Sequence, residues 1–262
     1  MIPALWISKT GLDAQQTNVS VTSNNLANAS TVGFKRGRAV FEDLLYQKIN
    51  QPGGRSSADS YLPEGLMIGS GAKVVATQRQ FSQGDVETTD NSFDLMIQGR
   101  GFFEIELPDG TTAYTRNGQF TKNEEGTIVT SGEGYPLLPQ IQVPDNATSL
   151  TVGRDGQVSV VLANDTASQD LGQITVTDFI NPTGLESIGD NLYLETTASG
   201  APQQGIGGED GMGVIRKNML GASNVKVTEE LVNLIQAQRV YEMNSKVLTT
   251  VDSMMGSLIQ SV

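Results

Sequence analysis

Apolar residues recur at every seventh position near both ends of the chain. Near the start, this column consists of Leu5, Leu12, Val19 and Leu26. Near the end, it consists of Val227, Leu234, Tyr241, Leu248, Met255 and Val262, with Leu231 on an adjoining position. A seven-residue repeat places such side chains along one narrow stripe of an α-helix. The pattern therefore predicts one helix over residues 1–34 and a second over residues 223–262.

Both stripes are narrow and are flanked by many Asn, Gln, Ser and Thr residues. For a single helix, packing against the protein's own core would be the simpler interpretation, but that arrangement usually shows a wider apolar face. The two terminal helices can pair with each other as a coiled-coil-like unit, although a pair still leaves much of each helix exposed. We therefore expect neighbouring copies of the chain to bury the rest.

Between the two ends, the pattern changes to short strands separated by turn residues. Four glycines are spaced eight residues apart, at Gly110, Gly118, Gly126 and Gly134. Asn117 precedes the second of them, and Asn-Gly is a strong signal for a two-residue hairpin turn. The predicted fold class is therefore α+β, with a mainly antiparallel β domain over residues 76–205 between the helical ends.

Two connecting regions flank the predicted β domain. Residues 35–75 contain a long Gly/Ser/Pro-rich stretch from Gln51 to Gly65, and residues 206–222 are rich in glycine. Structureless loops longer than about 12 to 15 residues are uncommon unless they are functional or disordered. We interpret the first region as a linking region and the second as a return linker.

The composition limits the chemistry that the chain can perform. It has 17 Lys and Arg against 29 Asp and Glu, a net charge of −12, which opposes contact with nucleic acid and anionic membranes. It contains no cysteine and no histidine, so thiol nucleophiles, disulfides, imidazole bases and the usual zinc ligands are absent. The apolar run Met1–Ile7 is too short for a membrane span or a signal-peptide core.

The carboxylates offer the remaining route to catalysis. A pair such as Asp90 and Asp94 could act as the acid and base of a glycosidase, for example one that cleaves peptidoglycan. Among 29 acidic residues, however, neighbouring pairs on solvated loops are expected. We therefore predict no catalytic, cofactor or metal site and keep a peptidoglycan-cleaving enzyme as the less favoured alternative.

The first helical pattern ends in the stretch Asn-Asn-Leu-Ala-Asn-Ala-Ser-Thr-Val-Gly-Phe-Lys-Arg, residues 24–36. A basic run beside an aromatic residue can bind nucleic acid, but a helix end explains the same residues more simply. Asn28 or Gly33 can adopt the left-handed conformation, Phe34 can pack back on the helix, and Lys35 suits the negative end of the helix dipole. We predict a structural stop.

The same stretch resembles the N-terminal signature of the bacterial flagellar axial family, which comprises the rod and hook proteins. Residues 99–103, Gly-Arg-Gly-Phe-Phe, and residues 229–242 are similar to the family's central domain and C-terminal helix. The resemblance covers nearly the whole chain. It implies a structural subunit, and not an enzyme, that polymerises helically with its terminal helices in the wall of a tube.

Residues 46–63 resemble an insertion found in rod members of the family rather than in hook subunits. The residues that we take to mark it are Tyr46, Pro52, Arg55, Tyr61 and Pro63. The resemblance implies that this insertion lies between neighbouring subunits and makes a straight, rigid tube, which transmits motor torque to the hook and forms part of the export channel. A hook subunit or a proximal rod subunit is the alternative.

The resemblance also implies the partners and the location. The partners would be copies of the same chain, other rod subunits, the hook protein and the hook–rod boundary, the surrounding basal-body rings and the flagellar export apparatus. The location would be the flagellar basal body, crossing the periplasm towards the outer membrane after export without a cleaved signal peptide. No cofactor, nucleic acid or membrane span is expected.

Overall fold

The computed structural model describes residues 3–50, 64–163 and 167–260, with side chains up to Ser257 in the last helix. The chain forms two compact units. We call residues 1–27, 37–79 and 226–262 the helical unit, and residues 28–36 and 80–225 the β unit. The fold is α+β, as predicted, with a helix near each end of the chain and a mainly antiparallel β region between them.

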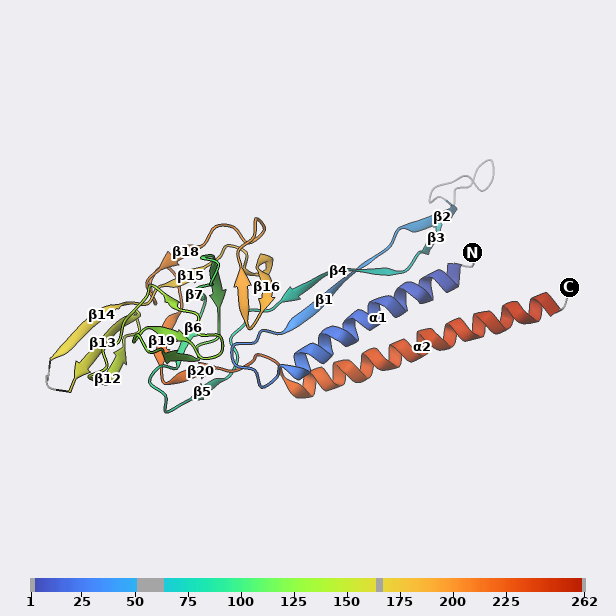
Figure 1. Ribbon diagram of the computed structural model, residues 1–262. Helices are drawn as coiled ribbons and strands as arrows, with labels where there is room; N and C mark the ends of the chain where they lie inside the picture. The colour runs from blue at the N-terminus through green and yellow to red at the C-terminus, as the bar shows by residue number, and fades with distance from the viewer. Residues whose placement is uncertain (1–2, 51–63, 164–166, 261–262) are drawn as a thin grey trace. The chain divides into compact units, whose positions relative to one another are not determined.

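In the helical unit, two long helices lie side by side (Figure 1). They are α1 (Pro3–Ala27) and α2 (Val227–Gln260). Asn25 of α1 lies beside Glu230, and Gly11, fourteen residues earlier in α1, lies beside Asn244, fourteen residues later in α2. The two helices are therefore antiparallel and keep one register over this length.

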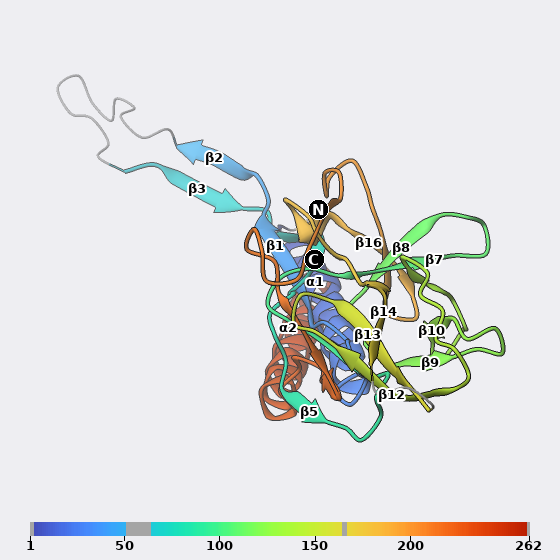
Figure 2. The same cartoon turned by 90° about the vertical axis from the view of Figure 1, so that its left-hand side faces the viewer.

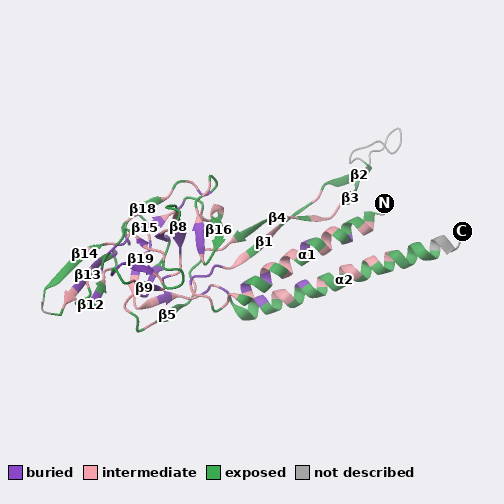
Figure 3. Ribbon diagram, in the orientation of Figure 1, coloured by how far each residue is buried: buried purple, intermediate pink, exposed green. Residues whose placement is uncertain are grey.

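The surface of α1 that packs most tightly consists of small and polar side chains. Its buried residues are Ser8, Ala14, Thr22 and Asn25. A Cβ atom added to Gly11 would lie 3.0 Å from Nδ2 of Asn244, which shows how closely the helices approach. In Figure 3, most of the surface of α2 is exposed. The helix pair therefore buries little apolar surface of its own.

A two-stranded ribbon packs along α1 in the same unit. Its base consists of β1 (Gly37–Asp43) paired with β4 (Ala72–Arg79), and its outer part consists of β2 (Tyr46–Asn50) paired with β3 (Leu66–Gly69). Figure 1 shows each pair side by side, and Figure 2 shows β2 beside β3. Gly71 has φ +114°, and a Cβ atom there would collide with the hydroxyl of Thr10. The predicted linking region thus begins and ends as paired strands.

The β unit contains short strands and one turn of 3₁₀ helix. They are β5 (Val86–Thr88), β6 (Leu95–Gln98), β7 (Phe103–Glu106), β8 (Thr112–Thr115), β9 (Phe120–Lys122), β10 (Ile128–Thr130), β11 (Leu137–Leu138), β12 (Ala147–Val152), β13 (Gln157–Leu162), β14 (Ser168–Gln173), β15 (Val176–Asp178), η1 (Pro182–Gly184), β16 (Glu186–Gly189), β17 (Leu192–Leu194), β18 (Gln203–Gly205), β19 (Val214–Lys217) and β20 (Met219–Gly221). The largest sheet has the order β11-β7-β8-β17-β16, and β12, β13 and β14 form a second sheet (Figure 2). Every strand pairing that the structure describes is antiparallel.

The Phe102-Phe103 pair supplies two separate parts of the core. Successive side chains of a strand point to opposite faces, so the two rings enter different clusters. Phe103 packs edge-on against Phe120 with the ring centroids 5.3 Å apart, whereas Phe102 packs against Phe179 at 5.9 Å. Both phenylalanines are almost fully buried. The β unit therefore has a core of its own, unlike the helix pair.

The hairpin predicted at Asn117-Gly118 is wrong. Strand β8 pairs with β7 and β17, whereas β9 pairs with β10, so the chain crosses between sheets at this point. Gly118 does not have a positive φ; a Cβ atom there would collide with the carbonyl oxygen of Leu95. The glycine serves close backbone packing. In contrast, Gly110 and Gly126 have φ of +80° and +82° in the β7–β8 and β9–β10 turns, as predicted.

The region that we interpreted as a return linker contains two strands of the β unit. Strand β19 pairs with β6, and β20 pairs with β5. A Cβ atom on Gly213 would lie 2.6 Å from Cγ2 of Ile97, so this glycine permits close packing and does not indicate a flexible tether. The interpretation as a linker is therefore corrected over Val214–Gly221.

Candidate functional site

The segment that follows α1 forms a compact turn in the β unit. The Thr31 amide donates to the Asn28 carbonyl oxygen at 3.2 Å, and the Phe34 amide donates to the Thr31 carbonyl oxygen at 3.3 Å. Gly33, and not Asn28, adopts the left-handed conformation, with φ +75°. A Cβ atom on Gly33 would lie 2.7 Å from the backbone nitrogen of Asn117. Both backbone conformation and space therefore require glycine at this position.

The basic residue after this turn is directed into the protein. Lys35 is buried, and its Nζ donates to the Ser82 carbonyl oxygen at 2.9 Å. Burial, with a smaller effect from the Arg116 guanidinium, lowers the pKa of Lys35 from 10.5 to about 8. Phe34 is also buried. The pair is therefore part of the folded unit, and Lys35 is not exposed to bind phosphate.

Asn224 joins three backbone segments within the β unit. Its Oδ1 accepts from the Arg36 amide at 2.7 Å, and its Nδ2 donates to the Gln80 carbonyl oxygen at 2.8 Å. The Gln80 amide in turn donates to the Arg36 carbonyl oxygen at 2.9 Å. These segments are the ones that lead out of α1, out of β4 and into α2. A single amide side chain therefore fixes all three chain connections.

In the helical unit, the side-chain amide of Asn25 likewise joins separate segments of the chain. Its Nδ2 donates to the Gly37 carbonyl oxygen and its Oδ1 accepts from the Gly37 amide, both at 2.8 Å. The same Nδ2 lies 3.3 Å from Oε2 of Glu230. Asn25 and Glu230 are each 2% exposed. The side chain thus pairs with the backbone of β1 as a neighbouring strand would, and links it to both helices.

Sequence reasoning did not find the contacts of Asn25, Asn224 or Glu230. Asn25 and Glu230 lie inside stretches that carry the family resemblance, which was the available signal. Their partners are far away in the sequence; Asn25 and Glu230, for example, are 205 positions apart. Local pattern analysis cannot find such pairs.

The predicted seven-residue columns are only partly covered. Leu5, Leu12, Val19, Leu26, Leu234 and Leu248 are half-buried. Val227, Leu231, Tyr241 and Met255 are exposed, and Val262 lies outside the described residues. Beside Val19 and Tyr241, a groove of about 580 Å³ runs between the two helices and is also lined by Gln16 and Gln238.

A further apolar stripe of α2, which sequence reasoning missed, is more exposed than the predicted column. We call it the outer stripe; it consists of Val232, Ile235, Met243, Val247 and Met254, which are between 45% and 64% exposed. Val232, Ile235 and Met243 line a shallow groove of about 470 Å³, which Arg239 also borders. Large contiguous apolar surfaces of this kind are typical of protein contact sites.

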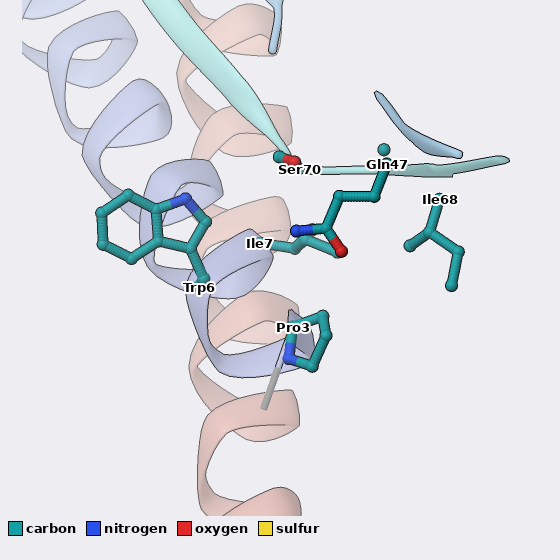
Figure 4. Close-up of a pocket in the computed structure, with 7 residues that line it drawn as sticks. Pro3, Trp6, Ile7, Gln47, Ile68 and Ser70 are labelled. Carbon is teal, nitrogen blue, oxygen red and sulfur yellow. The ribbon is translucent and has the colours of Figure 1, made fainter. Parts of the chain in front are cut away.

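The ribbon exposes apolar side chains in the same unit. Leu45 is 88% exposed, and Tyr46, Ile49, Leu66 and Met67 are between 42% and 57% exposed. Figure 4 shows a small pocket where the ribbon meets the start of α1, with Trp6 and Ile7 on the helix and Gln47 and Ile68 on the strands. Its volume is about 160 Å³. Of the predicted insertion residues, Tyr46 lies in β2, whereas Pro52, Arg55, Tyr61 and Pro63 lie outside the described residues.

The two carboxylates that we considered for catalysis, Asp90 and Asp94, lie in different surroundings. Asp94 is buried and accepts from Nδ2 of Asn91 at 2.9 Å, whereas Asp90 is exposed. The described residues contain no group of three or more acidic side chains that could hold a metal ion. None of the described helices is both long enough and apolar enough to span a bilayer.

Exposed apolar stripes on a long helix pair, together with an exposed apolar ribbon, are typical of a structural chain that associates with other chains. Three family models match the sequence. They are the flagella basal body rod protein over residues 6–35, the D1 domain of the flagellar hook protein FlgE/F/G over residues 96–160, and the C-terminal part of the flagellar basal body rod FlgEFG protein over residues 216–261.

Curated relatives match over nearly the full chain. The flagellar basal-body rod protein FlgG of Buchnera aphidicola subsp. Schizaphis graminum is 52% identical over 99% of this chain and 100% of its own length. In Caulobacter vibrioides, FlgG is 48% identical over 98% of both chains, whereas FlgF is 33% identical over 95% of both. The chain belongs to the flagellar rod and hook family, which is structural and not enzymatic.

Proposed function

We propose that this chain is the subunit of the distal rod of the flagellar basal body, where it polymerises helically into a straight, rigid tube. The full-length similarity to proteins named FlgG supports this function most directly. In Caulobacter vibrioides, FlgG is 48% identical to this chain and FlgF is 33% identical. This difference of 15 percentage points favours a distal rod subunit over another rod subunit. The tube would transmit motor torque to the hook and form part of the export channel.

The helical unit is our proposed site of polymerisation. The half-buried columns that include Leu12 and Leu248, and the groove beside Val19 and Tyr241, would be completed by helices of neighbouring copies in a coiled-coil-like arrangement. The outer stripe would contact a different neighbour. Two unlike surfaces on one chain give a heterologous contact, which produces an open helical polymer when the rotation does not close.

The ribbon and the insertion at residues 46–63 would stiffen this polymer. A two-stranded ribbon is at best marginally stable in water, and exposed apolar side chains at Leu45, Ile49 and Leu66 leave its outer part without a buried face. We propose that it lies against adjacent subunits, which then cannot slide past each other. Rigidity of the tube would follow.

Other partners and the route of the subunit follow from the same function. We propose contacts with neighbouring rod subunits, with the hook and hook–rod boundary, and with the surrounding rings, after passage through the flagellar export apparatus. The rod would cross the periplasm towards the outer membrane. The alternative is a hook subunit or a proximal rod subunit, and the assembly experiment described next tests it.

The test is assembly of the purified chain, observed by electron microscopy and by sedimentation. We expect straight tubes. Replacing Val232 and Ile235 with Asn should prevent their formation, because each side chain would otherwise bury apolar surface worth about 1.5–3 kcal/mol. Thr228→Asn, on an exposed position of the same helix, is the matched control. Curved tubes from the unchanged chain would favour a hook subunit. Normal assembly of the double variant would show that the outer stripe is not a contact between subunits.

A further inference from the structure

The sulfur atoms of this chain are unevenly distributed. The chain has eight methionines and no cysteine, so thioethers are its only sulfur groups. Among the methionines that the structure describes, four are exposed, and all four lie in the helical unit: Met67, Met243, Met254 and Met255. In the β unit, Met96 is 4% exposed, and Met212 and Met219 are partly buried. The accessible thioethers are therefore concentrated in the unit that we propose to polymerise.

Two of these methionines belong to the outer stripe. Met243 is 59% exposed and lines the groove that also contains Val232 and Ile235. Met254 is 61% exposed at the other end of the stripe. Methionine suits a contact surface because its side chain is flexible and polarisable, but its sulfur can be oxidised.

We infer that Met243 and Met254 are redox-sensitive positions, whose oxidation to the sulfoxide prevents the subunit from polymerising. This inference depends on the proposed function. The oxidant is a hydroperoxide. The thioether sulfur attacks the terminal peroxide oxygen, the S–O bond forms as the O–O bond breaks, and the leaving oxygen takes a proton to become water or an alcohol. Sulfur is oxidised by two electrons and the peroxide is reduced by two.

The sulfoxide opposes polymerisation because it changes an apolar surface into a polar one. The new oxygen is a strong hydrogen-bond acceptor, and burying it against an apolar neighbour without a donor is unfavourable. Arg239, which borders the groove, can donate to a sulfoxide at Met243. That contact would place a guanidinium group across the groove and block it. Either outcome removes the surface that a second copy would cover.

The reaction should depend on the state of assembly. A free subunit exposes both sulfur atoms, whereas a neighbouring copy on the outer stripe would cover them. Oxidation would therefore act on subunits before they join and would spare the finished polymer. Because methionine sulfoxide can be reduced enzymatically, the effect is reversible.

The experiment compares the full-length chain before and after treatment with hydrogen peroxide. Sulfoxide at each methionine is measured by peptide mass spectrometry, and polymer is measured by sedimentation. We expect oxidised protein to polymerise at least roughly tenfold less, since a polar group buried without a partner costs more than one tenfold step in affinity. In the variant Met243→Leu with Met254→Leu, peroxide should not reduce the amount of polymer relative to the same variant left untreated, because leucine has no sulfur atom to oxidise.

Met219→Leu, at a partly buried methionine of the β unit, is the control and should remain as sensitive as the unchanged chain. Treatment of the oxidised protein with methionine sulfoxide reductases should restore polymerisation. Unchanged polymerisation with sulfoxide at both positions, or equal sensitivity of the double leucine variant, would overturn the inference and leave the proposed function intact. A chain that does not polymerise even when untreated would overturn both. Circular dichroism of each variant establishes that it is folded.

Discussion

Gly33 allows the turn after α1 to be tested quantitatively. A residue with a Cβ atom at φ +75° is strained by about 1–2 kcal/mol relative to glycine. The Cβ atom would also lie 2.7 Å from the backbone of Asn117, and relieving such overpacking typically costs about 1–3 kcal/mol. Alanine also lowers the conformational entropy of the unfolded chain, which stabilises the folded state by about 0.4–1 kcal/mol. We expect Gly33→Ala to lower the free energy of unfolding of the β unit by about 3 kcal/mol, within a range of about 1–5 kcal/mol.

Two other glycines of the β unit separate these contributions. Gly110 has φ +80° but no atom within 4 Å of an added Cβ, so Gly110→Ala should cost only the backbone term, about 1 kcal/mol. Gly132 has neither a positive φ nor a close neighbour, so Gly132→Ala should change the free energy of unfolding by less than about 1 kcal/mol.

The assay must report on the β unit alone. The only tryptophan, Trp6, lies in the helical unit, so tryptophan fluorescence is unsuitable. Hydrogen exchange measured by mass spectrometry on peptides from residues 80–225, over a urea series, gives the required free energy. If Gly33→Ala costs no more than Gly110→Ala, the close approach to Asn117 does not constrain this turn and the reasoning fails.

Three further predictions concern Asn25, Lys35 and the insertion at residues 46–63. Asn25→Ala should lower the free energy of unfolding of the helical unit by about 2–4 kcal/mol, because it removes both side-chain hydrogen bonds to the Gly37 backbone and the contact with Glu230. Thermal unfolding by circular dichroism checks this, with the exposed Ser23→Ala expected to be neutral. The pKa of Lys35 is about 8 in the folded protein and 10.5 in the unfolded chain. Between about pH 8 and pH 10.5 the folded protein therefore binds fewer protons than the unfolded chain, and its free energy of unfolding should rise with pH. Lys35→Met should abolish that rise in urea titrations, and a persistent rise would assign it to another group. Deleting residues 46–63 should permit polymerisation but give curved or flexible tubes, and equally straight tubes in micrographs would contradict the stiffening role.

The elements that could be predicted from the sequence are those encoded by local spacing. The seven-residue columns indicated both terminal helices, because one face of a helix repeats at that interval whatever surrounds it. The turns at Gly110 and Gly126 were predictable because a positive φ selects glycine locally. The turn residues within 24–36 indicated that the first helix ends in this stretch, but α1 ends at Ala27, seven residues before the predicted bound of residue 34.

The rest depends on contacts between distant residues. Gly118 looks like a hairpin glycine, but its close neighbour is Leu95, which the local sequence does not reveal. Strands β19 and β20 are hidden in a glycine-rich region because their partners are β6 and β5, more than a hundred residues earlier. The outer stripe was missed because the column through Leu234 satisfied the repeat, and only the packing of α2 on α1 shows which face remains open.

The small buried side chains of α1 have a kinetic consequence. Ser8, Ala14 and Thr22 contribute little hydrophobic stabilisation, so the isolated helix pair is only weakly held together. Most of the free energy that orders these helices would then be released when a subunit joins its neighbours. The helices of a subunit would become ordered as the subunit binds to the growing end of the polymer. A subunit that leaves would have to lose its contacts with its neighbours and its ordered helices in one step. Such a chain would exchange slowly once incorporated while remaining adaptable beforehand.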